Sequence, residues 1–162
     1  MKNKRYFPMF VDLSDKNIVV VGGGNIATRR VKALLLFTRK ITVIAPKMTA
    51  DLWELGKMGR IQIQPRQVKR TDFDMAYMVL AASGNRELDE EIYRLCKDEG
   101  IYVNVSENRE LCDFYFPGIC MKENTVVGIA SGNIGPKKTK AVREKIQALL
   151  EEMAKNEEDY ED

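Results

Sequence analysis

The chain has 162 residues, of which 44% are hydrophobic and 31% are charged, and its formal net charge is +2. This length and composition are typical of a soluble protein with one hydrophobic core and a small additional unit. The small net charge argues against a nucleic-acid partner, and no apolar run reaches the roughly 20 residues that span a bilayer.

Two further features of the composition limit the chemistry. The chain has no histidine, which is the usual proton carrier near neutral pH. Cys96, Cys112 and Cys120 are an odd number of cysteines without the spacing of a metal site. The N-terminal stretch MKNKRYFPMFVDL has no long apolar segment, so we expect no signal peptide. We therefore predict free thiols, no metal site and a cytoplasmic location.

Hydrophobic, β-branched runs alternate with helix-like segments through the first two thirds of the chain. Strands that alternate with helices predict βαβ crossovers and a parallel sheet covered on both faces. We therefore predict an α/β fold with a doubly wound, Rossmann-like parallel sheet, and the alternating polar pattern of 61–66 suits an edge strand. The strand-like runs are 17–22, 40–46, 61–66, 76–83 and 101–106, and the helix-like segments are 25–37, 49–57 and 87–99.

The pattern changes after about Asp113. The segment DFYFPGICMKENTVVGIASG has two strand-like runs around the turn signal KEN and predicts a β-hairpin. Pro136 then begins a helix that runs to about Met153 and is followed by an acidic tail. We divide the chain into a nucleotide-binding domain, 1–112, and a dimerisation segment, 113–162. A hairpin and one helix bury little by themselves, so we predict a homodimer; the alternative is that the helix folds back on its own sheet.

Three glycines stand between the first predicted strand and the first predicted helix, in NIVVVGGGNIATRR. Gly22 permits the tight turn, Gly24 lets a diphosphate approach the backbone and the helix N-terminus, and Ala27 keeps the helix close to the strand. In this strand–turn–helix context the pattern predicts dinucleotide binding. The alternative is a turn with a structural role only.

The second strand ends without the acidic residue that grips the ribose in many dinucleotide sites. Its end reads Ile44-Ala45-Pro46-Lys47, so the ribose must meet backbone groups or Lys47. A lysine also suits a 2′-phosphate, and the residues alone leave NAD and NADP open. We place the second wall of the cofactor site in LAASGN, at Ala82 and Ser83, where small residues let a ring lie against the backbone. The alternative is a simple strand-to-helix turn.

Together, these segments resemble the precorrin-2 dehydrogenase/sirohydrochlorin ferrochelatase family, the first module of sirohaem synthases. The likeness is colinear over roughly residues 5–150. It implies a homodimer that uses NAD to oxidise the tetrapyrrole precorrin-2 to sirohydrochlorin, and some members also insert ferrous iron. The residues that carry it are YFPMFVDLSDKNIVVVGGGNIATRR, ITVIAP, VLAASGNRELDEEI, VNVSENRELCDFYFPGI and VVGIASGNIGPKKTKAVREKI. Carried across, the cofactor positions are Gly22, Gly24, Asn25, Ile26, Pro46 and Lys47.

The chain departs from the family pattern at two positions close to the expected chemistry. Many members have an aspartate where this chain has Glu107, which keeps the carboxylate on a longer side chain. In the family's S-x-G-x-S-P element Ser131 is kept, but the second serine is replaced by Gly135. Fuller members also extend into a C-terminal helical domain. We therefore expect iron insertion to be weak or absent.

The predicted catalytic residues are Glu107 and Ser131. Glu107 is the candidate general base for the proton that leaves the macrocycle; the alternative is a solvated loop acid, and Asp113 is a weaker second candidate. Ser131 is expected to hydrogen-bond the substrate or, alternatively, to begin a turn.

Positive charge is expected in the substrate site, because precorrin-2 carries many carboxylates. Arg109, Lys137 and Lys138 are the predicted substrate-binding residues. The two lysines lie at the start of the last predicted helix, where cations oppose the helix dipole. That local cost favours a function, but a solvated surface is the alternative.

Two other functions compete with this hypothesis. A non-catalytic, NAD-binding regulatory module would bind the nucleotide without turnover of precorrin-2. An ordinary NAD(P) reductase of small carbonyl compounds would need a histidine or a Tyr-x-x-x-Lys pair beside the nicotinamide. The chain has no histidine, and we expect no such pair.

Overall fold

The computed structural model describes residues 7–130 and 136–158. The chain forms two compact units: residues 11–115 make one, and residues 116–162 together with 1–10 make the other. The change of unit after Tyr115 lies close to the predicted domain boundary after Cys112. The dimerisation role assigned to the second segment stays a prediction.

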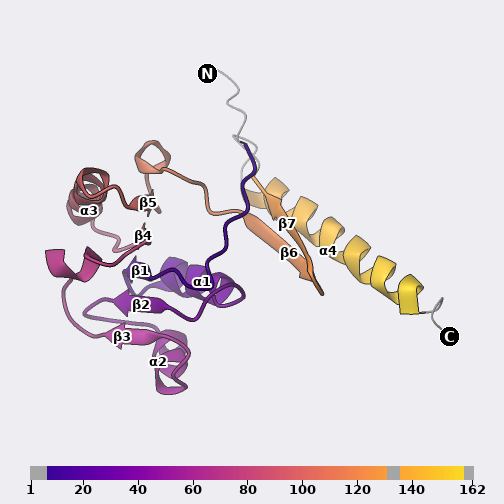
Figure 1. Ribbon diagram of the computed structural model, residues 1–162, viewed down its shortest axis with the longest axis horizontal. Coiled ribbons are helices and arrows are strands. Elements are labelled where there is room, and N and C mark those ends of the chain that lie inside the picture. The colour runs from indigo at the N-terminus through magenta and orange to yellow at the C-terminus, as the bar shows by residue number, and fades with distance from the viewer. Residues whose placement is uncertain (1–6, 131–135, 159–162) are drawn as a thin grey trace. The chain divides into compact units, whose positions relative to one another are not determined.

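The larger unit contains a five-stranded parallel sheet in the order β3-β2-β1-β4-β5 (Figure 1). The chain therefore winds outward from β1 on one side and crosses to β4 and β5 on the other. The predicted doubly wound α/β fold is confirmed, and β3 is an edge strand as its polar pattern indicates. The strands are β1 (Ile18–Val21), β2 (Ile41–Ile44), β3 (Gln62–Gln64), β4 (Met78–Ala81) and β5 (Tyr102–Val105).

The switch in winding direction falls between β1 and β4. These strands pair in parallel, with Val21 opposite Ala81. Their carboxyl ends therefore open side by side at one edge of the sheet. In open α/β sheets, ligands bind outside this edge, at the switch point.

Three α-helices connect the strands: α1 (Asn25–Leu34), α2 (Ala50–Lys57) and α3 (Arg86–Asp98). Two short 3₁₀ helices, η1 (Arg70–Phe73) and η2 (Arg109–Leu111), were not predicted. Helix α1 is shorter than its predicted range, 25–37. Leu36, which continued the hydrophobic pattern, is 54% exposed, so burial of its side chain gives little support to a further helical turn.

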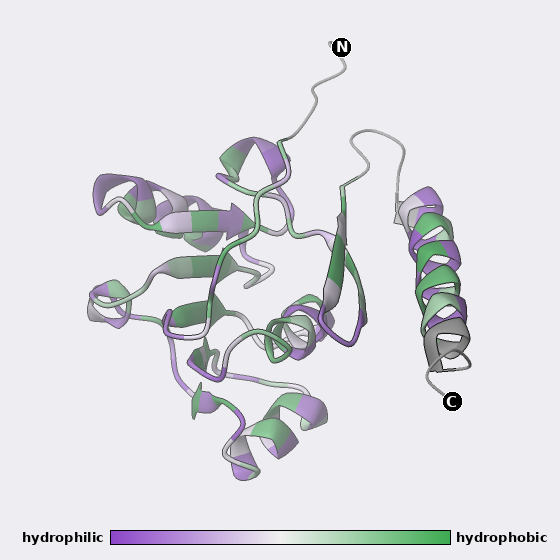
Figure 2. Cartoon of the chain, turned by 45° about the vertical axis from the view of Figure 1, so that its right-hand side comes forward, coloured by the Kyte–Doolittle hydropathy of each residue, from purple (hydrophilic) through white to green (hydrophobic). Residues whose placement is uncertain are grey.

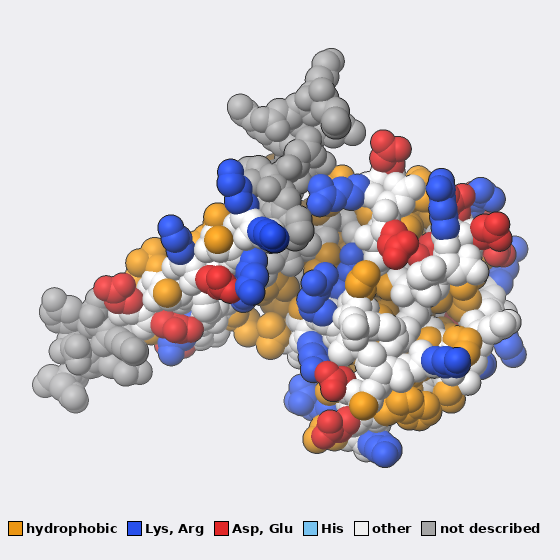
Figure 3. Space-filling model, turned by 180° about the vertical axis from the view of Figure 1, so that it is seen from behind, with side chains coloured by type: hydrophobic (Ala, Val, Ile, Leu, Met, Phe, Trp, Pro, Cys, Tyr) orange, Lys and Arg blue, Asp and Glu red, His pale blue; other side chains and the backbone are white. Residues whose placement is uncertain are grey.

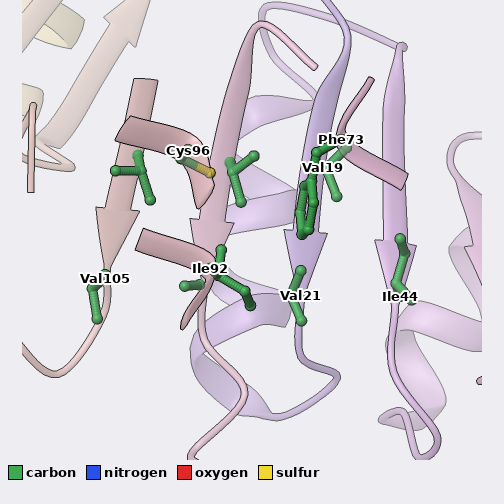
Figure 4. Packing of buried hydrophobic residues seen from close by; sticks show 10 residues of the cluster. Val19, Val21, Ile44, Phe73, Ile92, Cys96 and Val105 are labelled. Atoms are coloured by element: carbon green, nitrogen blue, oxygen red, sulfur yellow. The ribbon is translucent and has the colours of Figure 1, made fainter. Parts of the chain in front are cut away.

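One face of the sheet packs against α3 and η1. Alternate residues of β1, β4 and β5 point to this face, as the period of a strand requires. Ile92 and Cys96 of α3 and Phe73 of η1 cover them (Figure 4). Burial raises the pKa of the Cys96 thiol to about 12, so this cysteine is a packing residue. The cluster comprises Val19, Val21, Ile44, Phe73, Val79, Ala81, Ile92, Cys96, Val103 and Val105.

The smaller unit is a β-hairpin with one long helix. Strands β6 (Gly118–Lys122) and β7 (Thr125–Ile129) pair in an antiparallel ladder. Glu123 in the turn has a positive φ of 51°. The predicted hairpin around KEN is confirmed. Helix α4 (Pro136–Glu158) begins at the predicted proline and continues beyond Met153.

Helix α4 packs on β6 through side chain–backbone hydrogen bonds. The Gln147 amide accepts from the Met121 N–H at 3.2 Å and donates to the Met121 carbonyl at 3.3 Å. The Cys120 thiol donates to the Arg143 carbonyl at 3.1 Å. The side chain of Gln147 thus satisfies the backbone N–H and carbonyl of Met121, and α4 is held against β6.

The rest of α4 mixes apolar and charged side chains along its length. Hydrophobic and hydrophilic residues alternate around the helix (Figure 2), and Lys, Arg, Asp and Glu intersperse with hydrophobic side chains on it (Figure 3). Val142, Leu149 and Met153 are 46%, 54% and 52% exposed. No helix within the described residues is long and apolar enough to cross a membrane.

Candidate functional site

Three consecutive glycines follow β1, and each has different surroundings. Gly22 has a φ of +123°, and a Cβ there would overlap the carbonyl oxygen of Ala82. A Cβ on Gly23 would overlap the carbonyl oxygen of Lys47. A Cβ on Gly24, by contrast, would meet nothing within 4 Å. The first two glycines therefore let three segments of the chain converge, and the third borders open space.

The N-terminus of α1 faces this open space. Gly24 is the N-cap, with extended backbone angles, and no side chain caps this fully described helix. The first turn contains no acidic residue, and Asn25 and Ile26 are exposed. Unpaired N–H groups and the positive end of the helix dipole attract anions. This corner therefore fits the diphosphate of a dinucleotide.

Two threonines hold the loop after β2 beside Gly22, Gly23 and Gly24, which we call the glycine corner. The Thr49 N–H donates to the Gly23 carbonyl at 2.9 Å, and the Thr49 and Thr28 hydroxyl oxygens are 2.7 Å apart. Pro46 and Lys47, which precede this anchor, are exposed. The predicted adenosine contacts thus lie next to the predicted phosphate contacts.

The loop after β4 forms the opposite side of the switch point. The Ala82 N–H donates to the Val21 carbonyl at 2.8 Å. Ser83 follows, and its hydroxyl donates to the Asp89 carboxylate at 2.6 Å. Asp89 lies in α3 and is 3% exposed. Burial raises the pKa of the Asp89 carboxyl, the Ser83 donors oppose that rise, and the charge of Glu107 adds to it.

Glu107 lies in the loop after β5, at the same edge of the sheet. The loop is fixed at its start, because the Ser106 N–H donates to the Ala81 carbonyl at 2.9 Å. Glu107 is exposed and lines a cavity of about 310 Å³ that Asp89, Val105 and other residues also line. The structure thus brings Glu107, the glycine corner and the Ala82–Ser83 loop to one edge.

The remaining predicted residues fall in several places. Arg109 is an exposed residue of η2, and its carbonyl accepts from the Tyr115 hydroxyl at 3.4 Å. Lys137 and Lys138 are exposed in the first turn of α4, in the other unit. Ser131 and Gly135 lie outside the described residues. The roles of all these residues stay predictions.

Asp113, the weaker candidate base, has structural contacts. Its carboxylate accepts from the Val103 N–H at 3.0 Å and from the Lys97 ammonium at 2.6 Å. These bonds fix the chain where it returns along β5.

The expectation that the chain lacks a Tyr-x-x-x-Lys pair is wrong. Tyr93 and Lys97 have this spacing in α3. Lys97 lies in the last turn of the helix and is bound to Asp113. Because α3 begins at the carboxyl edge of the sheet, its last turn lies at the opposite edge from the glycine corner. The pair is therefore not placed for chemistry at that corner.

The residues that sequence reasoning missed are Gly23, Thr49 and Asp89. Gly23 makes room for the loop after β2. The Gly-x-Gly pattern leaves this middle position open and so does not predict a glycine there. For Asp89, the available signal was a carboxylate in the first turns of a helix with Ser83 shortly before it. Within the described residues, no cluster of three or more His, Cys, Asp or Glu is arranged to hold a metal ion.

The model of a family described as "Putative NAD(P)-binding" matches residues 9–118. The chain is 40% identical over 127 residues to a "Probable multifunctional siroheme biosynthesis protein HemA" of Ruminiclostridium josui, covering 78% of this chain and 25% of that protein. It is 32% identical over 146 residues to a "Siroheme synthase" of Nitrosococcus oceani, covering 90% of this chain and 31% of that protein.

A solved structure described as "SirC, precorrin-2 dehydrogenase" superimposes with a TM-score of 0.79 at 24% identity, covering 88% of this chain and 70% of that one. This likeness confirms the fold. The curated relatives confirm the family resemblance inferred from the sequence. The chain spans only between a quarter and a third of the length of those relatives, at 25% and 31%.

Proposed function

The chain belongs to the putative NAD(P)-binding family, and on this premise we propose that it oxidises precorrin-2 to sirohydrochlorin with NAD⁺ as the hydride acceptor. One observation carries the proposal: the uncapped N-terminus of α1 faces open space over Gly24, at the switch point of the sheet. The names of the relatives, siroheme synthase and siroheme biosynthesis protein, support the choice of substrate.

The reaction removes one hydride and one proton from precorrin-2 and yields sirohydrochlorin, NADH and H⁺. When bound, NAD⁺ supplies the hydride acceptor. The N–H groups at the start of α1 would hold its diphosphate, and the Ala82–Ser83 loop would support its nicotinamide half. A carboxylate oxygen of Glu107 accepts the proton. Arg109, Lys137 and Lys138 are the proposed contacts of the substrate carboxylates.

The test is anaerobic mixing of precorrin-2 and NAD⁺ with the protein, followed by NADH absorbance. We expect turnover by the wild type and a kcat about 10²- to 10⁴-fold lower in Glu107→Ala, since a positioned base contributes that much. Glu107→Asp should recover most of the rate. Glu110→Ala, an exposed acid nearby in η2, is the matched control and should retain full activity.

Binding of NAD⁺ without any NADH formation would contradict the proposal and would favour the non-catalytic regulatory module. NADP⁺ is titrated in parallel, because the exposed Lys47 suits a 2′-phosphate. Faster turnover with NADP⁺ would reverse the proposed cofactor preference while leaving the reaction class intact.

We also propose that insertion of iron is weak or absent, that the protein is a homodimer and that it works in the cytoplasm. The three cysteines are free, which suits a reducing compartment. Chelation is tested with sirohydrochlorin and Fe²⁺ or Co²⁺ under anaerobic conditions. Chelation far above the uncatalysed rate, lost in Glu107→Ala, would overturn the first of these statements.

A further inference from the structure

Asp89 is a buried carboxyl group that the proposed chemistry does not use. It lies in the first turn of α3 and is 3% exposed. A buried ionisable group costs free energy unless hydrogen-bond donors compensate for the lost water. The position of those donors shows what Asp89 does in the fold.

Both donors come from one residue, Ser83, in the loop after β4. The Ser83 N–H and hydroxyl reach the same oxygen, Oδ1 of Asp89, at 3.2 and 2.6 Å. The Ser83 oxygen in turn accepts from the Asn85 N–H at 3.0 Å. The Asn85 side chain caps α3 by accepting from the Glu87 and Leu88 N–H groups. The loop is therefore tied to α3 at both of its ends.

This loop also contacts the glycine corner. The Ala82 carbonyl lies so close to Gly22 that no Cβ fits between them, and the Ala82 N–H is bonded to Val21. A displacement of Ser83 would therefore move the Ala82–Ser83 loop, which lies on the other side of the switch point from the α1 N-terminus. Asp89 and Glu107 line the same cavity of about 310 Å³. The displacement would therefore also change the surroundings of Glu107, the proposed base.

We propose that Asp89 is a positioning residue: its Oδ1 fixes Ser83 and thereby the wall on which the nicotinamide half of the dinucleotide rests. This inference rests on the proposed function, because it assumes a dinucleotide at the switch point. It requires an acceptor oxygen at the end of a short side chain. Asparagine provides that oxygen, whereas alanine removes the acceptor of the Ser83 N–H and leaves the Ser83 hydroxyl only the Asn85 carbonyl, at 3.2 Å.

The experiment compares Asp89→Ala, Asp89→Asn and Ser83→Ala with the wild type in the intact protein. Calorimetry measures the Kd for NAD⁺, and hydrogen exchange measures the opening of 82–85 without cofactor. In Asp89→Ala we expect faster exchange of this loop and a Kd raised about tenfold or more, since small misplacements are costly. Asp89→Asn should restore both values, and Ser83→Ala should weaken binding in the same direction as Asp89→Ala.

Asp72→Ala is the matched control. Asp72 also anchors a loop, by accepting from the Lys69 N–H at 2.7 Å, but it lies outside the switch-point loops. Its removal should destabilise the protein without changing the Kd for NAD⁺. An unchanged Kd in both Asp89→Ala and Ser83→Ala would overturn the proposal, and so would an Asp89→Asn variant as defective as Asp89→Ala.

The two proposals fail in different ways. If the wild type binds no NAD⁺, the proposed function is wrong, and the exchange of 82–85 still shows whether Asp89 fixes the loop. If the wild type binds NAD⁺ and the Asp89 variants bind it equally well, the function stands and the positioning role is wrong. If Asp89→Ala does not fold, Ser83→Ala, which removes only the hydroxyl donor, decides the question.

Discussion

At the scale of single residues, Gly22 and Gly24 perform different tasks although one residue separates them. Gly22 has no space for a side chain and has a φ that other residues rarely adopt. Gly24 has ordinary backbone angles, with φ at −83° and ψ at −172°, and open space around it. Packing therefore demands glycine at the first position, whereas at the second the reasons for glycine are its place as the N-cap and the approach of a ligand.

Substitution by alanine separates these two tasks. Gly24→Ala should cost no more than about 1 kcal/mol of unfolding free energy, the loss expected at an N-cap, yet raise the Kd for NAD⁺ about tenfold or more. Gly22→Ala should cost about 3 kcal/mol or more, since it combines strain with overlap. Urea unfolding and calorimetry measure the two effects. Wild-type affinity in Gly24→Ala would show that the diphosphate does not approach this residue.

Asp72 gives a prediction of pH dependence. The Arg66 guanidinium donates to its two oxygens at 2.7 and 2.8 Å and holds the pKa of this carboxyl below its ordinary value. A lowered folded-state pKa stabilises the protein above the unfolded-state pKa and ceases to do so as the pH falls through the folded-state value. Asp72→Asn should therefore cost about 1 kcal/mol near neutral pH, as expected of a partly exposed pair.

The difference between the wild type and Asp72→Asn should shrink below about pH 4, where the unfolded-state carboxyl protonates. Urea unfolding at a series of pH values measures it. A difference that stays constant down to about pH 2 would mean that the Arg66 pair does not lower the pKa of Asp72.

At the scale of elements, the sequence predicts helices, strands and turns correctly wherever the signal lies within a few neighbouring residues. The continuous apolar runs of β1 and β4 predict buried parallel strands, and KEN predicts the hairpin turn. The ends of elements were less certain: α1 stops at Leu34, and the pattern does not report that the side chain of Leu36 is exposed. The contact of Thr49 with Gly23 depends on the approach of the loop after β2 to the loop after β1. Only the folded chain brings these segments together.

Thr49 connects two of these elements. Its hydroxyl accepts from the Leu52 N–H at 3.4 Å, which caps α2, and lies 2.7 Å from the Thr28 hydroxyl of α1. Thr49→Ala should lower the free energy of unfolding by about 1 kcal/mol, the usual cost of a lost N-cap. Thr49→Ser keeps the hydroxyl and is the control. Equal losses in the two variants would attribute the effect to the methyl group instead.

At the scale of the whole molecule, α4 carries the argument for a dimer. Val142, Leu149 and Met153 are spaced by seven and four residues, so they form one stripe along the helix, and each is about half exposed. A second copy of the chain would bury this stripe. The family resemblance also implies a homodimer, and we propose that the stripe contributes to its interface.

Leu149→Glu should therefore convert the dimer to a monomer without unfolding the protein, because Leu149 is 54% exposed. Light scattering after gel filtration measures the mass, and circular dichroism follows the fold. Ala148→Glu, an exposed position beside the stripe, should remain dimeric. A wild-type mass equal to one chain would rule out the dimer altogether.

A crystal structure of the protein with bound NAD⁺ tests the assignment of the glycine corner. We predict that the diphosphate lies against the N–H groups that begin α1, over Gly24 and Asn25. The nicotinamide should lie along the Ala82–Ser83 loop and face Glu107. A dinucleotide bound anywhere else on the chain, or crystals that take up none at saturating concentration, would contradict the assignment of the glycine corner.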